Sequence, residues 1–401
     1  MSAHNPRKFA SPGNLKKLEQ NILIKFLQPF KRYLESKGMQ LQINGTTSFD
    51  YDLLASILLN ADDDMPVELS DALFFVNEMA SEDRMDALLV SARNNNIPIV
   101  NNDDVTPADI AAQLWIVKPD LLESLHAEYL VSKPKAFEHF RSYEETPANL
   151  PIPDRAVLLK MQKELDEWFI SHKRGGSCKV FPFDHGRKLC LLIRHGKPFK
   201  REGSLTNGKS QTILYRPESY DVIIYDHADN ELAINGSATK GERLLYLEVV
   251  GKHLFGSVDY FLSETKYILD PLMTDGAASL VCSDIEGIDN VKLIQVKRYL
   301  GGEHGDKETI DTKDYFSSKS WDGELSLHKS LVSATLSIEF TNAKRPRTVR
   351  IVPPNKAIFE RDDDSTSVEQ LLKARGFILQ PTKGYKGAIY EAGITKTMGC
   401  H

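Results

Sequence analysis

The hydrophobic period of the chain changes near Gly175-Gly176, and this change limits the folds open to it. Before these glycines apolar residues recur at helical spacing, and after them short segments have the pattern of strands. The candidate strands lie at 178–183, 187–194, 211–216, 220–226 and 231–235. Because parallel neighbours need long crossovers, the short loops between these segments predict an antiparallel sheet.

The clearest part of this sheet is a hairpin. Tyr220–Asp226 and Glu231–Asn235 are joined by only four residues, which is typical of a β-hairpin. A helix is predicted next, from about 240 to 254, and Gly256 is expected to end it.

Helices are predicted throughout the first part of the chain. The best-marked start has Thr106 as N-cap, Pro107 at the first helical position and Asp109 at the third. The expected helices lie at about 15–34, 49–60, 67–80, 82–94, 107–118, 120–131 and 134–142, and a connecting helix begins at 154. In the last part, strands are expected at 291–300, 331–340 and 346–352, and a helix at 366–375.

These elements predict an α+β protein with an N-terminal all-helical domain, an antiparallel-sheet α+β domain and a smaller α+β C-terminal region. At 401 residues the chain is too long for one ordinary core, so several domains are expected. We expect disorder over 1–13, the helical domain over 14–145, and a linker with the connecting helix over 146–175. The antiparallel α+β domain is expected over 176–260 and the C-terminal α+β region over 261–401.

Composition excludes several classes of protein. The apolar fraction of 41% and the charged fraction of 26% are close to globular averages. No apolar run approaches the ~20 residues that span a bilayer, and no apolar segment follows the N-terminus as in a secretory signal. The four cysteines are far apart, so neither structural zinc nor disulfides are expected. We therefore expect a cytoplasmic protein with no membrane association.

Charge is unevenly distributed along the chain. Residues 47–86 are strongly acidic, whereas residues 172–201 and 344–361 are basic. Lysine and arginine neutralise phosphates, and the interleaved Phe181, Phe183 and Phe199 could stack on bases. The predicted nucleic-acid-binding residues are Lys179, Arg187, Lys188, Arg194, Lys197, Lys200, Arg201, Lys344, Arg345, Arg347 and Arg350. The alternative is a solvated surface, or one that pairs with the acidic part of the same chain.

A second candidate site lies further on. Asp284-Ile-Glu-Gly-Ile-Asp289 precedes a segment in which Gln295 and Lys297 share one face of a strand. This short stretch resembles the Gly-x-Asp and Gln-x-Lys segments of Mrr-type restriction nucleases. The resemblance implies that Asp284 or Asp289, with Gln295, holds Mg²⁺ and that Lys297 positions a water. The alternative is an edge strand with a polar exposed face.

The segment Arg194-His195-Gly196 resembles the strand-end motif of the histidine phosphatases. In that family a long helix follows the motif, whereas here Arg216-Pro217 and further strands follow. The family's Ser-Pro-Leu-x-Arg segment is also missing. A phosphatase is therefore disfavoured, and a basic strand end is the simpler interpretation.

Over most of its length the chain resembles no characterised family. We predict a nucleic-acid-associated binding or adaptor component of a bacterial multi-protein system, in antiviral defence or in a mobile element. The first alternative is an Mg²⁺-dependent nuclease of the restriction-endonuclease-like class. The second is a protein-interaction scaffold whose acidic N-terminal helices bind a partner subunit. No cofactor is expected except the Mg²⁺ of the nuclease alternative.

Overall fold

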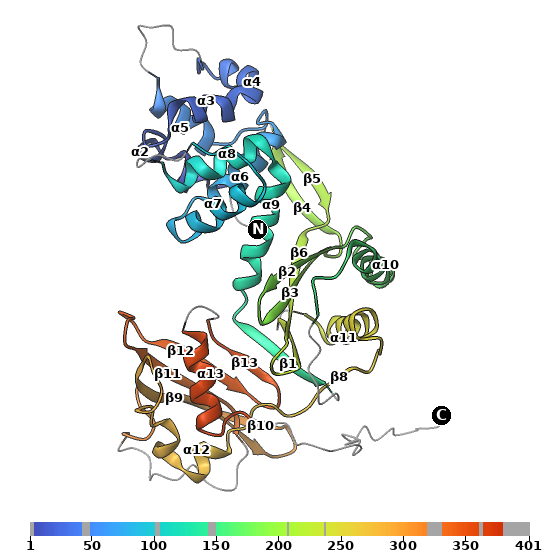
Figure 1. Ribbon diagram of the computed structural model, residues 1–401, viewed down its shortest axis with the longest axis vertical. Coiled ribbons are helices and arrows are strands. Elements are labelled where there is room, and N and C mark those ends of the chain that lie inside the picture. The colour runs from blue at the N-terminus through green and yellow to red at the C-terminus, as the bar shows by residue number, and fades with distance from the viewer. Residues whose placement is uncertain are drawn as a thin grey trace. The chain divides into compact units, whose positions relative to one another are not determined.

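A computed structural model describes residues 4–41, 49–100, 105–142, 150–206, 208–235, 238–318, 331–360 and 364–379 (Figure 1). The chain divides into two units. Unit 1 contains residues 1–132, 169–181 and 194–220, and unit 2 contains 133–168, 182–193 and 221–401. The division passes through α10 (Arg155–Ser171), β2 (Lys179–His185), β3 (Lys188–Gly196) and β6 (Glu218–Asp226).

The first part of unit 1 is helical, as the apolar spacing predicted. Its α-helices are α1 (Arg7–Ala10), α2 (Pro12–Leu15), α3 (Gln20–Leu27), α4 (Lys31–Ser36), α5 (Tyr51–Leu59), α6 (Val67–Met79), α7 (Met85–Asn94), α8 (Pro107–Val117) and α9 (Pro119–Ser132). The α8 residues from Pro107 to Leu114 are all buried, so this helix lies at the centre of the helical core. The helix begins at the predicted capping box, in which Thr106 is the N-cap and Asp109 is the third helical residue.

Residues 4–13 differ from the disorder predicted over 1–13, and residues 1–3 lie outside the described residues. Helices α1 and α2 form there, and the Phe9 side chain is fully buried. The Phe9 ring packs edge-on against Phe26, with 5.2 Å between the ring centroids. The backbone N–H groups of Lys8 and Phe9 donate to Asn77 Oδ1 at 2.8 and 3.3 Å. The segment is ordered despite its polar composition, because the Phe9 ring is buried and the backbone N–H groups beside it are hydrogen-bonded.

The strands form an eleven-stranded sheet. Its order is β10 (Asp306–Asp311), β9 (Ile288–Gly301), β11 (Leu331–Phe340), β12 (Arg347–Val352), β13 (Lys356–Ile358), β1 (Ala136–Ser142), β7 (Glu231–Asn235), β6, β3 and β2, with β8 (Phe261–Leu262) paired to β1. The predicted hairpin is confirmed, because β6 and β7 pair antiparallel from Ile223–Ile234 to Asp226–Glu231. The mixed α+β class is confirmed as well.

The strand β1 corrects one prediction. A helix was expected at 134–142, but Ala136–Ser142 is a strand that pairs antiparallel with both β13 and β7. Its two aromatic side chains, Phe137 and Phe140, are buried, and a strand with both edges paired satisfies its backbone groups. Because β1 lies between β7 and β13, it joins the expected middle and C-terminal regions in one sheet.

Helices cover both faces of the sheet in unit 2 (Figure 1). Residues of α12 (Asp270–Thr274) and α13 (Ser365–Ala374) share a core with the inward residues of β9, β11 and β12. The opposite face is covered near β1 by α11 (Lys240–Phe255), where Arg243 Nε lies 2.9 Å from Glu138 Oε2. As predicted, α11 ends at Gly256, which has a φ of 77°.

A separate two-stranded sheet belongs to unit 1. It consists of β4 (Lys200–Thr206), which the sequence did not reveal, and β5 (Lys209–Tyr215). The two strands pair in continuous register from Lys200–Tyr215 to Thr206–Lys209. We call this element the β4–β5 ribbon.

The close approach of α11 to the chain that follows it gives a test of the fold. A Cβ on Gly251 would lie 2.4 Å from the Ser257 carbonyl oxygen, so Gly251→Ala should lower the free energy of unfolding by about 1–3 kcal/mol. The matched control is Gly241→Ala in the same helix, whose Cβ would be 3.4 Å from the Trp168 ring. The control should be neutral or slightly stabilising. Urea denaturation measures both, and equal stabilities would contradict the packing described.

Candidate functional site

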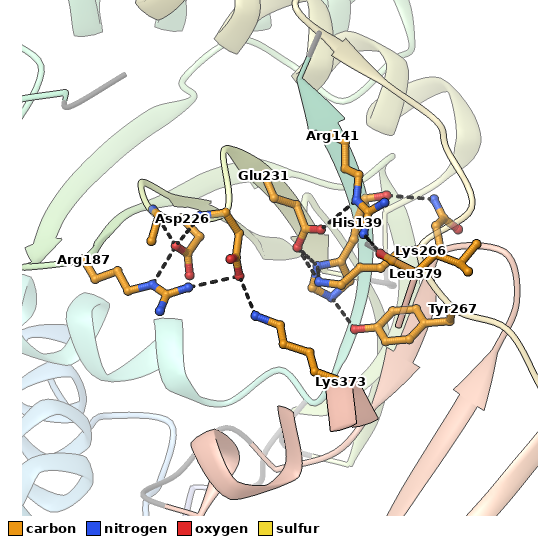
Figure 2. Close-up of polar contacts among 12 residues, drawn as sticks. His139, Arg141, Arg187, Asp226, Glu231, Lys266, Tyr267, Lys373 and Leu379 are labelled. Atoms are coloured by element: carbon orange, nitrogen blue, oxygen red, sulfur yellow. Dashed lines mark hydrogen bonds and ion pairs between the residues drawn. The ribbon is translucent and has the colours of Figure 1, made fainter. Parts of the chain in front are cut away.

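Three ionisable side chains meet in the interior of unit 2 (Figure 2). His139 is 4% exposed, Glu231 is 6% exposed and Lys266 is 8% exposed. Glu231 Oε1 lies 2.6 Å from His139 Nδ1 and 2.5 Å from Lys266 Nζ. Lys266 Nζ is also 3.1 Å from His139 Nδ1, so the three groups form one closed triangle, which we call the buried triad.

The sheet register places the buried triad. His139 and Arg141 lie on the same face of β1, and β7 pairs Ala233 with His139 and Glu231 with Arg141. Lys266 comes from the segment that follows β8, where its backbone N–H donates to the Pro354 carbonyl at 2.8 Å. The cluster therefore joins β1, β7 and this later segment.

The electrostatics of the buried triad are dominated by Glu231. Burial alone would raise the pKa of its carboxyl, but the charges and hydrogen bonds of His139 and Lys266 outweigh burial and hold this pKa well below its usual range. Arg141 Nε adds a positive charge 3.9 Å from Glu231 Oε2. On the other side of the imidazole, the Tyr267 hydroxyl lies 3.4 Å from His139 Nε2.

The chemistry open to the buried triad follows from its burial. Histidine, glutamate and lysine are the residues of acid–base catalysis, but a general base must reach the proton that it abstracts. The three side chains are 4, 6 and 8% exposed, and each is hydrogen-bonded to the other two, so their polar groups are engaged within the chain. We conclude that the triad holds the sheet together and fixes the orientation of each member.

A second network lies at the surface of unit 2 (Figure 2). Arg187 Nε is 2.8 Å from Asp226 Oδ1, and its Nη2 is 3.0 Å from Asp229 Oδ2. Lys373 of α13 binds the same Asp229 oxygen at 3.3 Å. The hydrogen bond to Asp226 is the main reason that the pKa of the Arg187 guanidinium is raised. Arg187, predicted to bind nucleic acid, is thus engaged by two carboxylates of its own chain.

The predicted cations of unit 1 have mixed surroundings. Arg194 Nε is 3.3 Å from Glu218, and Lys200 forms an ion pair with Glu202. Lys179 Nζ lies 4.7 Å from the centroid of the Phe181 ring. The other two residues differ, because Arg201 donates to the neutral Thr212 hydroxyl at 3.0 Å and Lys197 has no carboxylate within ion-pair distance among the described residues.

The predicted cations of unit 2 are similarly divided. Arg347 lies 3.0 Å from Asp364 and 3.7 Å from Glu360, so two acids balance its charge. Lys344 and Arg345 are exposed at the turn between β11 and β12, and Lys188 is half-buried at the start of β3. Arg350 donates to the Ser333 hydroxyl at 3.3 Å. The predicted set is thus distributed over both units.

The residues predicted for the nuclease alternative are only partly brought together. Asp289, Gln295 and Lys297 all lie on the single strand β9, where six residues correspond to roughly 20 Å between Asp289 and Gln295. Asp289 instead accepts a hydrogen bond from Thr341 at 2.7 Å, and Asp284 binds Arg375. Gln295 and Lys297 remain neighbours on one face, but without either predicted carboxylate.

His195, the centre of the phosphatase resemblance, is 4% exposed. Its ring stacks on Phe169 with 4.6 Å between the centroids, and its Nδ1 lies 3.0 Å from the Gly196 carbonyl oxygen. A histidine that accepts a phosphoryl group has to be accessible, so this environment does not favour a phosphatase.

Sequence reasoning missed His139 and Lys266. His139 was missed because a helix was expected at 134–142. The pattern that indicates a strand is a period of two, which places Phe137, His139 and Arg141 on one face. Lys266 carries no local signal, because its partners are 35 and 127 residues away in the chain.

The buried triad makes a stability prediction. Glu231→Ala should lower the free energy of unfolding by about 3–5 kcal/mol, because it leaves a buried cation without its partner. The control is Glu360→Ala, which removes the partly exposed partner of Lys135 and Arg347 and should cost at most about 1 kcal/mol. Chemical denaturation compares the two, and equal losses would contradict the assigned role of the triad.

The lowered pKa of Glu231 sets the direction of a pH effect. A carboxyl whose pKa is lower in the folded state stabilises the fold above its unfolded pKa of about 4.3, and this contribution is lost as the pH falls towards the folded pKa. Glu231→Gln should therefore make the unfolding free energy less dependent on pH below about 4.5. Denaturation midpoints between neutral and acidic pH test this. If the unfolding free energy of the variant depends on pH as steeply as that of the unchanged protein, the pKa of Glu231 is not lowered in the folded state.

Comparison with known proteins does not assign the chain to a family. No protein-family model and no curated protein matches the chain. Within the described residues, no helix combines the length and apolar character that crossing a bilayer requires. The function has to be inferred from the arrangement of the chain's own side chains.

Proposed function

We propose that the chain is a nucleic-acid-binding adaptor of a larger assembly, and that the β4–β5 ribbon is its contact element. The supporting observation is the charge of this exposed ribbon and of the residues that flank it. Residues 197–216 contain five cations and one acid, namely Lys197, Lys200, Arg201, Lys209 and Arg216 against Glu202. Every β5 residue from Lys209 to Leu214 is exposed. Such an excess of positive charge favours a polyanionic partner.

The shape of the ribbon suits the same partner. A two-stranded antiparallel ribbon fits the major groove of a DNA duplex, which is about 12 Å wide. The register places Arg201 and Thr212 on one face, and Lys209 and Gln211 on the other. Each face thus offers a cation for phosphates and a neutral polar side chain that can reach a base edge.

The ribbon and the residues that flank it also carry exposed apolar side chains. Phe199 is 64% exposed, and the Arg216 guanidinium lies 4.0 Å from the centroid of its ring. Leu205 and Leu214 are 79% and 65% exposed. An aromatic ring beside a guanidinium is a platform on which an unpaired base can stack. The apolar residues would equally suit a protein partner, so the experiment has to separate the two.

Charge reversal tests the proposal. The triple variant Lys197→Glu, Arg201→Glu and Lys209→Glu should weaken binding to a labelled DNA or RNA oligonucleotide by at least about tenfold at low salt. It should also make the plot of log affinity against log salt shallower by roughly 2–3, because about 0.9 of slope is lost for each phosphate contact. Fluorescence anisotropy measures both quantities.

The control has the same change of charge elsewhere. Lys17→Glu, Lys25→Glu and Arg32→Glu reverse three exposed cations of the helical part. This variant should bind as the unchanged protein does. If both triple variants lose affinity equally, or neither does, the ribbon is not the contact element. Co-purification with a protein subunit in the absence of nucleic-acid binding would favour the scaffold alternative instead.

The wider predictions stay predictions. A bacterial multi-protein system and a role in antiviral defence or a mobile element rest on the sequence alone. The nuclease alternative gains no support from the separation of Asp289 from Gln295 along β9.

A further inference from the structure

One face of β9, β11 and β12 in unit 2 is polar. Val291, Leu293 and Val296 of β9 are buried in the core with α12 and α13. Gln295 and Lys297 lie on the opposite face, in register with Thr335 and Ser333 of β11. Thr335 is in turn the register partner of Arg350 on β12. Two adjacent rows across the three strands therefore carry hydroxyl, amide and cationic side chains.

Arg350 has an unsatisfied donor within these rows. One terminal nitrogen, Nη2, donates to Ser333 Oγ at 3.3 Å. Its Nε is buried and has no hydrogen-bond acceptor in the described part of the chain. A buried charged donor without a partner is costly, and in folded proteins it often marks the place of an ion or an ordered water.

Lys297 adds a second positive charge. It is the register partner of Ser333, the residue that accepts from Arg350. Cross-strand partners have Cβ atoms about 5 Å apart, so Lys297 and Ser333 are neighbours on this face. Across the described ranges no carboxylate lies within ion-pair distance of its ammonium group.

The acid of these rows is already engaged. Asp311 of β10 is the register partner of Gln295, and its Oδ1 accepts from Gln295 Nε2 at 2.7 Å. The Thr335 hydroxyl completes the row by donating to Gln295 Oε1 at 3.3 Å. Gln295 thus stands between the carboxylate on β10 and the hydroxyl on β11, and two strands, β9 and β11, separate Asp311 from Arg350 on β12.

We propose that this face holds a phosphate-class oxyanion. Arg350 offers the edge formed by Nε and a terminal nitrogen, which binds such an anion through two parallel hydrogen bonds. The Lys297 ammonium supplies a second charge, and the Ser333 hydroxyl supplies a further donor or acceptor. The site lies entirely in unit 2 and does not depend on the β4–β5 ribbon.

The first experiment titrates the full chain with inorganic pyrophosphate in a calorimeter. We expect saturable binding, and a loss of affinity of more than about tenfold in Arg350→Gln and in Lys297→Gln, because each variant removes a charged hydrogen-bond donor to the anion. Lys292→Gln is the matched control, because this lysine lies on the same strand but already pairs with Glu339 at 3.4 Å. The control should bind as the unchanged protein does.

Stability has to be separated from binding. Arg350 is half-buried, so circular dichroism and the melting temperature are recorded for every variant. Lys297→Gln replaces a side chain without an ion pair and should remain folded, so it decides the question if Arg350→Gln does not fold. No saturable binding by the unchanged protein, or full binding by Lys297→Gln, would overturn the proposal.

The second experiment identifies the source of the phosphate. A short single-stranded oligonucleotide is titrated against the same variants, and against the ribbon triple variant. Binding of the oligonucleotide that weakens in Lys297→Gln but persists in the ribbon variant assigns the site to a nucleic-acid backbone. Binding of pyrophosphate alone assigns it to a small phosphorylated molecule. Both outcomes support an oxyanion site, and the ribbon proposal can fail without affecting either.

Discussion

The carboxylate of Glu231 is the interaction on which unit 2 depends. It accepts from a histidine of β1 and from a lysine that follows β8, and it does so where its own exposure is 6%. An isolated charge at that depth would be ionised only at great cost. Two donors at 2.5 and 2.6 Å keep it ionised, so removing one partner would leave an uncompensated buried charge.

The position of β1 follows from the same contacts. This strand lies between β7 and β13, and through it the middle hairpin and the C-terminal strands become parts of one sheet. The two faces of β1 have different partners. On one face His139 contacts Glu231, and on the other Glu138 pairs with Arg243 of α11. A single strand thus connects helices and strands that are far apart in the sequence, and the unit is not a sum of separate modules.

Ion pairs within the chain reduce the number of cations that are available to bind phosphates. Several predicted cations, including Arg187, Arg194 and Arg347, already face carboxylates of their own unit. What remains is the β4–β5 ribbon, with an excess of cations at its surface, and the polar face of β9, β11 and β12. The two places share one physical property, a positive charge that the described part of the chain does not balance. Both proposals rest on that property.

The sequence by itself determined the local elements, because hydrophobic period, capping residues and glycine stops are properties of neighbouring residues. The hairpin, the capping box at Thr106 and the end of α11 at Gly256 could all be predicted in this way. Only the tertiary structure decided the rest. It made 136–142 a strand by pairing both of its edges, joined Glu231 to residues up to 92 positions away, and set Arg350 beside Ser333 across two strands. Such contacts depend on register and burial, which no short stretch of sequence specifies.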